Sequence, residues 1–267
     1  MNRLPRPELA PFVTQLWASQ SDGTPGAREL VLPTGAMHLV LRLDEPLRLY
    51  DEPSRGAPCR VVGHAIIGGA RASSYVRDIS RPSASVGAQL RPGAAELLLG
   101  VPAIELAEHH TRLDDVWGRF ADELRAQLAE APDPAARLAR FEAALLARLP
   151  RVRGVHPAVA HALQRFRAGS EVGAVVDEVG YSHRRFIALF EHAVGLTPKR
   201  YCRVQRLQRA IAQLPGHPLG EVALNAGFSD QAHLNREFRA LVGLSPGDYR
   251  ARAPVAPLHV PLPAKKP

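Results

Sequence analysis

The stretch Ala226-Gly227-Phe228-Ser229 decides the fold of the C-terminal half, because an earlier stretch, Val179-Gly180-Tyr181-Ser182, repeats its pattern. A second pair of stretches follows the two copies at nearly equal spacing: Gly195-Leu196-Thr197-Pro198 and Gly243-Leu244-Ser245-Pro246. In each copy a glycine that can take the left-handed conformation ends a short helix, an aromatic residue enters the core and a serine caps the next helix. The repeat therefore predicts two tandem units of helix, tight turn and helix.

The second helix of each predicted unit has a buried stripe and an outward face of mixed chemistry. The stripe contains Phe186, Leu189, Phe190 and Ala193, then Leu234, Phe238 and Leu241. The outward residues are His183, Arg184, Ile187 and Ala188 in the first helix and Gln231, His233, Asn235 and Arg236 in the second. Arginine pairs with guanine, glutamine and asparagine pair with adenine, and an apolar group contacts the thymine methyl. These faces are therefore candidates for reading bases in a major groove.

A longer helix is predicted between the two units. Thr197 caps it, Pro198 opens it, and it runs to about Leu214. At 1.5 Å per residue it spans roughly 25 Å, enough to hold two reading helices about one turn of DNA apart. Its core stripe is Tyr201, Val204, Leu207, Ile211 and Leu214. The candidate contacts to DNA phosphates are Lys199, Arg203 and Arg206 on its other side, together with Ser182 and Ser229.

Charge divides the chain into a neutral half and a basic half. The net charge is +8, yet residues 1–150 hold 17 Lys and Arg against 18 Asp and Glu, whereas residues 151–253 hold 15 against 8. A basic half of this kind is the electrostatic footprint of a polyanion-binding protein, although an acidic membrane or protein partner would suit it as well. Charge indicates the class of partner without deciding it.

Composition excludes several classes of protein. No run of about 18 apolar residues occurs, so a membrane span is excluded. Residues 1–11 lack the apolar region of a secretory signal, and the expected location is the cytoplasm. The two cysteines, Cys59 and Cys202, provide neither a disulfide framework nor a Cys-x-x-Cys metal pair, and we expect reduced thiols.

Residues 30–91 are predicted to form short strands. Residues 37–43 and 47–50, joined by Asp44-Glu45-Pro46, are expected to pair as a hairpin with one buried face. Further strands over 60–67 and 83–90 favour a small sandwich or barrel. Helical spacing begins after Ala94 and gives two stripes that should pack on the sheet: Leu113, Val116, Trp117, Phe120, Leu124 and Leu128, then Leu138, Phe141, Leu145, Leu146 and Leu149.

These patterns predict three segments. Residues 1–150 form a β-rich sensor or dimerisation domain, and residues 151–253 form the double helix-turn-helix domain. The boundary is expected within residues 150–157, which have the composition of an exposed joint. Residues 254–267 are proline-rich and are predicted to be a disordered tail.

The second unit resembles the signature of the AraC-type family of transcriptional regulators. The resemblance rests on Gly227-Phe228-Ser229-Asp230-Gln231, Phe238, Gly243, Ser245-Pro246 and Tyr249-Arg250, and it covers about residues 158–252. It implies reading positions at His183, Arg184, Ile187 and Ala188 in the first helix, and at Gln231, Ala232, His233, Asn235 and Arg236 in the second.

The first unit departs from the family pattern at three positions. Ile187 and Ala188 stand where a polar or basic reader is common, and Val176 stands where the supporting helix commonly has a small alanine. The second unit keeps the small residue, as Ala223. We therefore expect the first unit to read its DNA box weakly, or through methyl contacts and DNA shape.

The N-terminal half is similar to a sensor-like domain of unknown function found in one branch of these regulators. The similar stretches are Val31-Leu32-Pro33-Thr34-Gly35, Arg91-Pro92-Gly93-Ala94 and Leu113-Asp114-Asp115-Val116-Trp117-Gly118. The resemblance implies a cupin-like β fold. The expected fold class is α+β, with a β-rich cupin-like N-terminal domain and flanking helices, followed by an all-α domain of two helix-turn-helix units joined by a linker helix.

The leading interpretation is a sequence-specific DNA-binding transcription regulator that reads two adjacent major-groove segments and is controlled through its N-terminal domain. The expected partners are double-stranded promoter DNA, a small-molecule effector, RNA polymerase and a second copy in a homodimer. An effector would bind inside the β-rich domain, where Leu39 and Leu41 either line a pocket or fill it. Neither catalysis nor a cofactor is expected.

Other interpretations stay open at this stage. A metal-dependent cupin-like enzyme with an accessory DNA-binding unit is the main alternative, although its candidate ligands lack a His-x-His with a following Glu: His38, His64, His109 and His110. Cys59 invites comparison with alkyl-accepting repair regulators, but that chemistry needs a thiolate in a multi-cysteine zinc site. The remaining alternatives are a ligand-free architectural DNA binder and a helical bundle with a solvated basic face.

Overall fold

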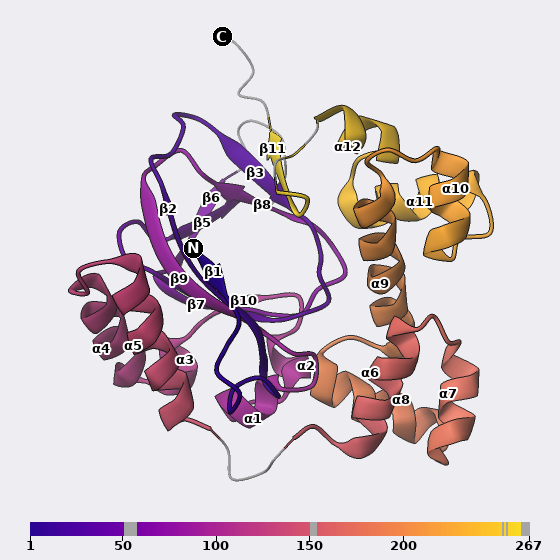
Figure 1. Ribbon diagram of the computed structural model, residues 1–267, viewed down its shortest axis with the longest axis horizontal. Helices are drawn as coiled ribbons and strands as arrows, with labels where there is room; N and C mark the ends of the chain where they lie inside the picture. The colour runs from indigo at the N-terminus through magenta and orange to yellow at the C-terminus, as the bar shows by residue number, and fades with distance from the viewer. Residues whose placement is uncertain (51–57, 150–153, 253, 255, 263–267) are drawn as a thin grey trace.

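A β-rich half and a helical half lie side by side (Figure 1). The structure is a computed structural model that describes residues 1–50, 58–149, 154–252, 254 and 256–262. The predicted α+β class is confirmed, with strands in the first half of the chain and helix-turn-helix units in the second. No helix in the described ranges is long and apolar enough to cross a membrane.

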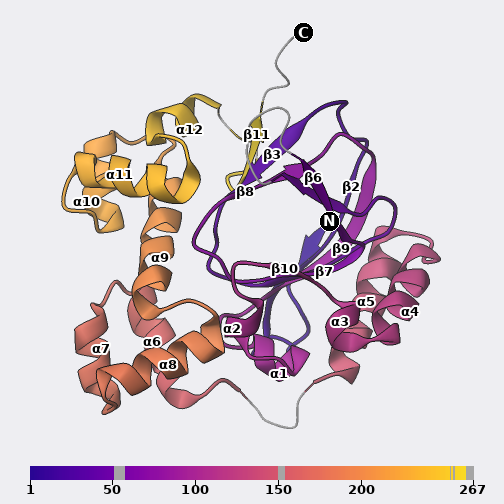
Figure 2. The same ribbon diagram turned by 180° about the vertical axis from the view of Figure 1, so that it is seen from behind.

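Two antiparallel sheets form the N-terminal half. The first sheet contains, in spatial order, β1 (Asn2–Arg3), β2 (Val13–Ser21), β9 (Ser83–Leu90), β4 (His38–Arg42), β7 (Ala65–Gly68) and β10 (His110–Arg112). The second contains β11 (His259–Leu262), β3 (Arg28–Val31), β8 (Tyr75–Asp78), β5 (Leu47–Tyr50) and β6 (Cys59–Gly63). The sheets face each other, and the N-terminal half closes around the space between them (Figures 1 and 2).

The predicted hairpin between residues 37–43 and 47–50 is wrong. Strand β4 pairs with β7 and β9 in the first sheet, whereas β5 pairs with β6 and β8 in the second. The intervening turn carries the chain from one sheet to the other, and Asp44 accepts a hydrogen bond from the main-chain N of Ala84 at 2.9 Å. Alternation identified the buried face of each strand correctly, but it says nothing about which strand is the neighbour.

Helices cover the outer face of the first sheet (Figure 1). The predicted stripe from Leu113 to Leu128 is divided at Gly118, whose φ of 58° interrupts the helix between α3 (Asp114–Trp117) and α4 (Arg119–Ala129). Helix α5 (Pro134–Ala147) follows, capped by Asp133, and α4 and α5 pack on β2, β7 and β9. Two short helices, α1 (Ala95–Leu99) and α2 (Ala103–Leu106), lie closer to the helical half.

The C-terminal half is helical from Pro157 to Arg252, apart from the short connections between its helices. It contains α6 (Pro157–Arg167), α7 (Val172–Val179), α8 (His183–Val194), α9 (Pro198–Gln213), α10 (Leu219–Ala226), α11 (Gln231–Val242) and α12 (Pro246–Arg252). An aromatic cluster of Phe166, Phe186, Phe190 and Tyr201 joins α6, α8 and α9. Of the expected domain boundary at 150–157, residues 150–153 lie outside the described residues, and α6 begins at Pro157.

The tail predicted to be disordered contains a strand within its described residues, while residues 255 and 263–267 lie outside the described residues. Residues His259–Leu262 form β11, which pairs along its whole length with β3 and supplies the edge of the second sheet. Val260 is fully buried there, and Tyr249 of α12 donates a 2.7 Å hydrogen bond to the carbonyl of Pro257. Composition predicted disorder because it describes only the segment itself. It carries no information about a sheet edge elsewhere in the fold to which the segment can add a strand. The helical half is consequently attached to the β-rich half at both of its ends.

Candidate nucleic-acid interface

The first helix-turn-helix unit consists of α7, a turn at Gly180 and α8. Gly180 has a φ of 69°, in the left-handed region predicted for it, and Ser182 caps α8 by accepting a hydrogen bond from the main-chain N of Arg185. Phe186 and Phe190 are fully buried, which orients the opposite face of α8 outward. The predicted reading residues are all exposed: His183, Arg184, Ile187 and Ala188.

The second unit consists of α10, a turn at Gly227 and α11, but its cap differs from the prediction. Asp230, rather than Ser229, is the N-cap, and its carboxylate accepts a 2.7 Å hydrogen bond from the main-chain N of His233. That bond lowers the pKa of Asp230, so the cap is ionised at neutral pH. Ser229 instead donates to the Asp230 carboxylate at 3.1 Å. A charged acceptor takes the cap because it binds the free amides of the first turn more strongly than a hydroxyl does.

The predicted readers of the second unit divide into two groups. Gln231, Ala232 and Arg236 are exposed on α11, whereas His233 and Asn235 are half-buried. The ring of His233 contacts Phe228 edge-on, with the centroids 5.4 Å apart, and its Nδ1 lies 3.1 Å from Oγ of Ser229. The His233 side chain is therefore engaged in the turn, and the exposed group is the one free to reach a base edge.

Helix α9 runs from the first unit to the second (Figure 1). Thr197 caps it and Pro198 opens it, as predicted, and its 16 residues span about 24 Å. All five residues of the predicted core stripe are buried: Tyr201, Val204, Leu207, Ile211 and Leu214. The two units are thus held by one continuous helix with a packed face.

The predicted phosphate contacts on α9 have different surroundings. Lys199 is exposed at the start of the helix. Arg203 binds Glu237 of α11 through two hydrogen bonds, of 2.7 and 3.1 Å, and Arg206 lies over the ring of Phe228 at 5.8 Å with its Nε buried. Both arginines therefore join α9 to the second unit. Ser182 and Ser229 are exposed at the first turns of α8 and α11.

Sequence reasoning missed the contacts between the helical half and the β-rich half. Arg200 of α9 forms an ion pair with Glu108, and the main-chain N of Ser74 donates a 3.0 Å hydrogen bond to the carbonyl of Leu241 in α11. At Gly195, whose φ is 83°, a Cβ atom would lie 2.9 Å from the carbonyl oxygen of Ala103 in α2. Arg200 was visible only as one basic residue among many, because its partner is 92 positions away.

The residues considered for an effector or a metal lie within the sheets. Leu39 and Leu41 are fully buried in the hydrophobic core, and neither is among the residues that line the cavity between the sheets. His38 and His110 flank Gly68 on the neighbouring strands β4 and β10, and His64 Nε2 lies 3.1 Å from the carbonyl of Asp44. Among the described residues, no group of three or more His, Cys, Asp or Glu is arranged to hold a metal ion.

Two families match the chain. A family described as "Helix-turn-helix domain" matches residues 175–252, and a family described as "Domain of unknown function (DUF6597)" matches residues 1–112. The first match begins in α7 and ends with α12, so it contains both turns and the linker helix. The second contains every strand of the two sheets except β11.

Curated relatives are transcriptional regulators by name. The HTH-type transcriptional activator RhaR of Klebsiella pneumoniae is 29% identical over 182 residues, which are 62% of this chain and 59% of that protein. The HTH-type transcriptional regulator MtrA of Neisseria gonorrhoeae is 31% identical over 81 residues, 30% of this chain and 27% of that protein. Several other relatives are matched over about a third of their length or less.

Among solved structures, ToxT from Vibrio cholerae is similar over 90% of this chain and 97% of that chain, with a TM-score of 0.45 and 9% sequence identity. The helix-turn-helix match coincides with the unit built by α7 to α12. The unit built by α7 to α12 is therefore a helix-turn-helix domain of the AraC type, and residues 1–112 match a domain family of unknown function.

Proposed function

We propose that this protein is a sequence-specific DNA-binding transcription regulator that reads two adjacent major-groove segments. The observation that carries the proposal is the pair of capped, outward-facing helices, α8 and α11, on the single linker helix α9. A helix fits the major groove, and two successive groove segments on one face lie about 34 Å apart. The linker spans about 24 Å, and the width of the helices at its ends adds to this length. The two reading helices can therefore be separated by about the distance between the two groove segments.

The proposed base readers are the exposed members of the predicted set. On α8 they are His183, Arg184, Ile187 and Ala188, and on α11 they are Gln231, Ala232 and Arg236. Arg184 and Arg236 would supply the bidentate contacts to guanine, while Ile187 and Ala188 offer only methyl contacts. His233 and Asn235 are half-buried and serve as supports of the second reading helix.

The proposed phosphate contacts are Lys199, Arg206 and the first turns of α8 and α11. Free main-chain N–H groups at a helix N-terminus bind phosphate oxygens, and Ser182 and Ser229 lie exposed beside those groups. Arg203 is assigned to the packing of α9 on the second unit, because its guanidinium binds Glu237 there. Arg206, whose guanidinium lies over the ring of Phe228, stays among the proposed phosphate contacts.

We divide the chain accordingly into an N-terminal control domain, residues 1–150, and a DNA-binding domain, residues 151–253. The control domain would sense a small molecule or form a homodimer, and RNA polymerase is the further partner that an activator would contact. Action on promoter DNA places the protein in the cytoplasm of a bacterial cell, the kind of cell from which the matched relatives come.

Selection of binding sites from random DNA by the full chain tests the proposal. We expect the recovered sequences to share two conserved blocks whose centres lie about 10 base pairs apart. Binding with equal affinity to every sequence would support an architectural DNA binder instead. Recovery of one conserved block would mean that a single helix reads bases.

A further inference from the structure

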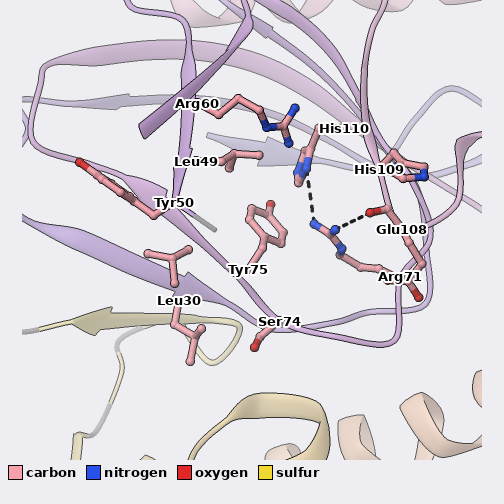
Figure 3. Close-up of a pocket in the computed structure, with 11 residues that line it drawn as sticks. Leu30, Leu49, Tyr50, Arg60, Arg71, Ser74, Tyr75, Glu108, His109 and His110 are labelled. Atoms are coloured by element: carbon pink, nitrogen blue, oxygen red, sulfur yellow. Dashed lines mark hydrogen bonds between the residues drawn. The ribbon is translucent and has the colours of Figure 1, made fainter. Parts of the chain in front are cut away.

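A cavity of about 270 Å³ lies between the two sheets of the N-terminal half. This volume is close to the lower end of the range for small-molecule sites, about 300–1,000 Å³. Leu49 supplies an apolar side chain to one wall, whereas Leu30 and Val76, which also line the cavity, lie on the opposite face of the second sheet. The other wall carries polar and charged groups, namely Arg60, Arg71, Glu108, His109 and His110 (Figure 3). The cavity therefore suits a compact molecule with one apolar end and one polar end.

Arg71 is the dominant charge in this wall. Its Nη2 donates a 2.7 Å hydrogen bond to the main-chain carbonyl of Glu108, its Nη1 lies 3.4 Å from Nδ1 of His110, and the guanidinium stands over the ring of Tyr75 at 4.7 Å (Figure 3). Within the described part of the chain, no carboxylate forms an ion pair with Arg71, and its buried Nε has no hydrogen-bond partner. A half-buried cation without a counter-ion is costly, and an anionic ligand removes that cost.

The groups beside Arg71 are neutral at physiological pH. Burial, followed by the charge of Arg71, lowers the pKa of His110 to about 3, so its ring carries no charge there. Burial raises the pKa of Tyr75, which keeps its hydroxyl protonated. The carboxylate of Glu108 is occupied elsewhere, because it accepts from Arg200, from the main-chain N of Ala72 and from the hydroxyl of Ser73. An incoming anion would thus meet the Arg71 cation beside two neutral hydrogen-bonding side chains.

We propose that this cavity binds a small organic anion, with the carboxylate on Arg71 and the apolar body against Leu49 and the ring of Tyr75. The ring of Tyr75 lines the cavity next to Arg71. It contacts the ring of His110 edge-on, with the centroids 4.5 Å apart. Arg60 lines the same cavity and adds a second positive charge at its polar end.

The segment that carries Arg71 also contacts the DNA-binding unit. The main-chain N of Ser74 donates to the carbonyl of Leu241 at 3.0 Å and its hydroxyl donates to the carbonyl of Val242 at 3.2 Å, at the end of α11. Glu108 connects Ala72 and Ser73 to Arg200 in the first turn of α9. Glu108 has a φ of 61°, the left-handed region, so this connection rests on a constrained backbone. A ligand that repositions Arg71 therefore acts on residues that contact both the linker and the second reading helix.

Titration calorimetry with the full chain tests the site, using phenylacetate as the probe and phenylacetamide as its neutral isostere. We expect phenylacetate to bind saturably and the amide to bind at least about tenfold more weakly, because the amide lacks the charge that Arg71 requires. The substitution Arg71→Gln should weaken phenylacetate by at least about tenfold. Arg81→Gln, at an exposed arginine paired with Glu45 outside the cavity, should leave the affinity unchanged.

A second variant tests the site independently in case Arg71→Gln does not fold. Arg60 is an exposed residue that also lines the cavity. Arg60→Gln should therefore leave the melting temperature unchanged and still weaken the binding of phenylacetate. Equal affinities for the acid and the amide would overturn the proposal, as would the absence of saturable binding by phenylacetate, benzoate and 4-methylpentanoate alike. Binding of inorganic phosphate with greater affinity than all three would overturn the assignment to an organic anion.

The link to DNA rests on the proposed function and is measured separately. Phenylacetate should change the affinity of the full chain for its selected DNA site. Arg200→Gln, which removes the α9 partner of Glu108 and lies outside the cavity lining, should abolish that change while phenylacetate still binds. Because the calorimetry contains no DNA and the site selection contains no ligand, failure of one leaves the other standing. An unchanged DNA affinity at saturating phenylacetate would overturn the coupling.

Discussion

Arg203 of α9 and Glu237 of α11 form a two-bond ion pair, with Nε 2.7 Å from Oε2 and Nη2 3.1 Å from Oε1. Parallel bonds of this kind fix direction as well as distance, because the guanidinium and carboxylate planes must align. The pair therefore sets the angle between the linker helix and the second reading helix. This arrangement makes Arg203 a positioning residue, whereas Lys199 is exposed at the start of the same helix.

Lys199 and Arg203 of α9 should respond differently to removal. Lys199→Gln should weaken binding to all DNA sequences alike and reduce the slope of log K against log salt by about 0.9, the value for one phosphate contact. Arg203→Gln should leave that slope unchanged, lower the stability by about 1 kcal/mol and weaken recognition of the second box. Salt titrations of DNA binding and thermal melts measure both. A loss of slope in Arg203→Gln would restore Arg203 to the phosphate contacts.

The two reading helices should be separable by mutation. Arg236→Ala should cost about 1–3 kcal/mol of binding and relax base preference only in the box read by α11, since a bidentate contact to guanine is lost. Arg184→Ala should do the same in the other box. Arg239→Ala is the matched control, because Arg239 is exposed in the last turn of α11, away from the end that enters the groove. Relaxed preference in both boxes after either change would contradict separate reading.

The spacing between the boxes should be restricted by the length of α9. Inserting 5 base pairs rotates one box to the opposite face of the duplex, so affinity should fall sharply, while an insert of 10 restores the face but exceeds the reach of the linker. Affinities for sites with inserts of 0, 5 and 10 base pairs provide the measurement. Undiminished binding at 5 would mean that one helix alone reads DNA, and Ile187 and Ala188 identify the first helix as the idle one.

Docking of the C-terminal strand should depend on pH. Glu29 of β3 accepts from Arg77 at 2.5 Å and lies 2.9 Å from Nδ1 of His259 in β11. Burial by itself would raise the pKa of Glu29, but the hydrogen bond from His259 and the charge of Arg77 outweigh it and lower that pKa below 4.5. A lowered folded-state pKa stabilises the fold above the unfolded value, and the contribution is lost as pH falls through the folded value.

Hydrogen exchange in residues 259–262 measures this effect. We expect protection of β11 to hold at pH 7 and to fall selectively in acid, below about pH 4. Glu29→Gln should show the weakened protection already at neutral pH and lose most of the pH dependence. Protection that is the same in both proteins at every pH would show that main-chain pairing with β3 alone holds the strand.

The sequence alone determined the two helix-turn-helix units and the linker helix. The glycines at 180 and 227, the caps at Ser182 and Thr197 and the apolar spacing act over four residues or fewer, and such short-range signals are written in the chain itself. Even the error at Ser229 was local, a displacement of the cap by one residue to a stronger acceptor, Asp230. The family resemblance rested on the same short stretches.

The tertiary structure decided what depends on partners far apart in the chain. It placed β4 and β5 in different sheets, docked β11 on β3, paired Arg203 with Glu237 and brought Arg71 and His110 to one cavity. Alternation and composition report whether a residue prefers burial, but strand order and ion pairing are set by which surfaces meet when the whole chain packs. In the sequence each arginine is simply one positive charge. The packed fold pairs Arg203 with the carboxylate of Glu237, whereas Arg71 in the cavity wall forms no ion pair with a carboxylate among the described residues.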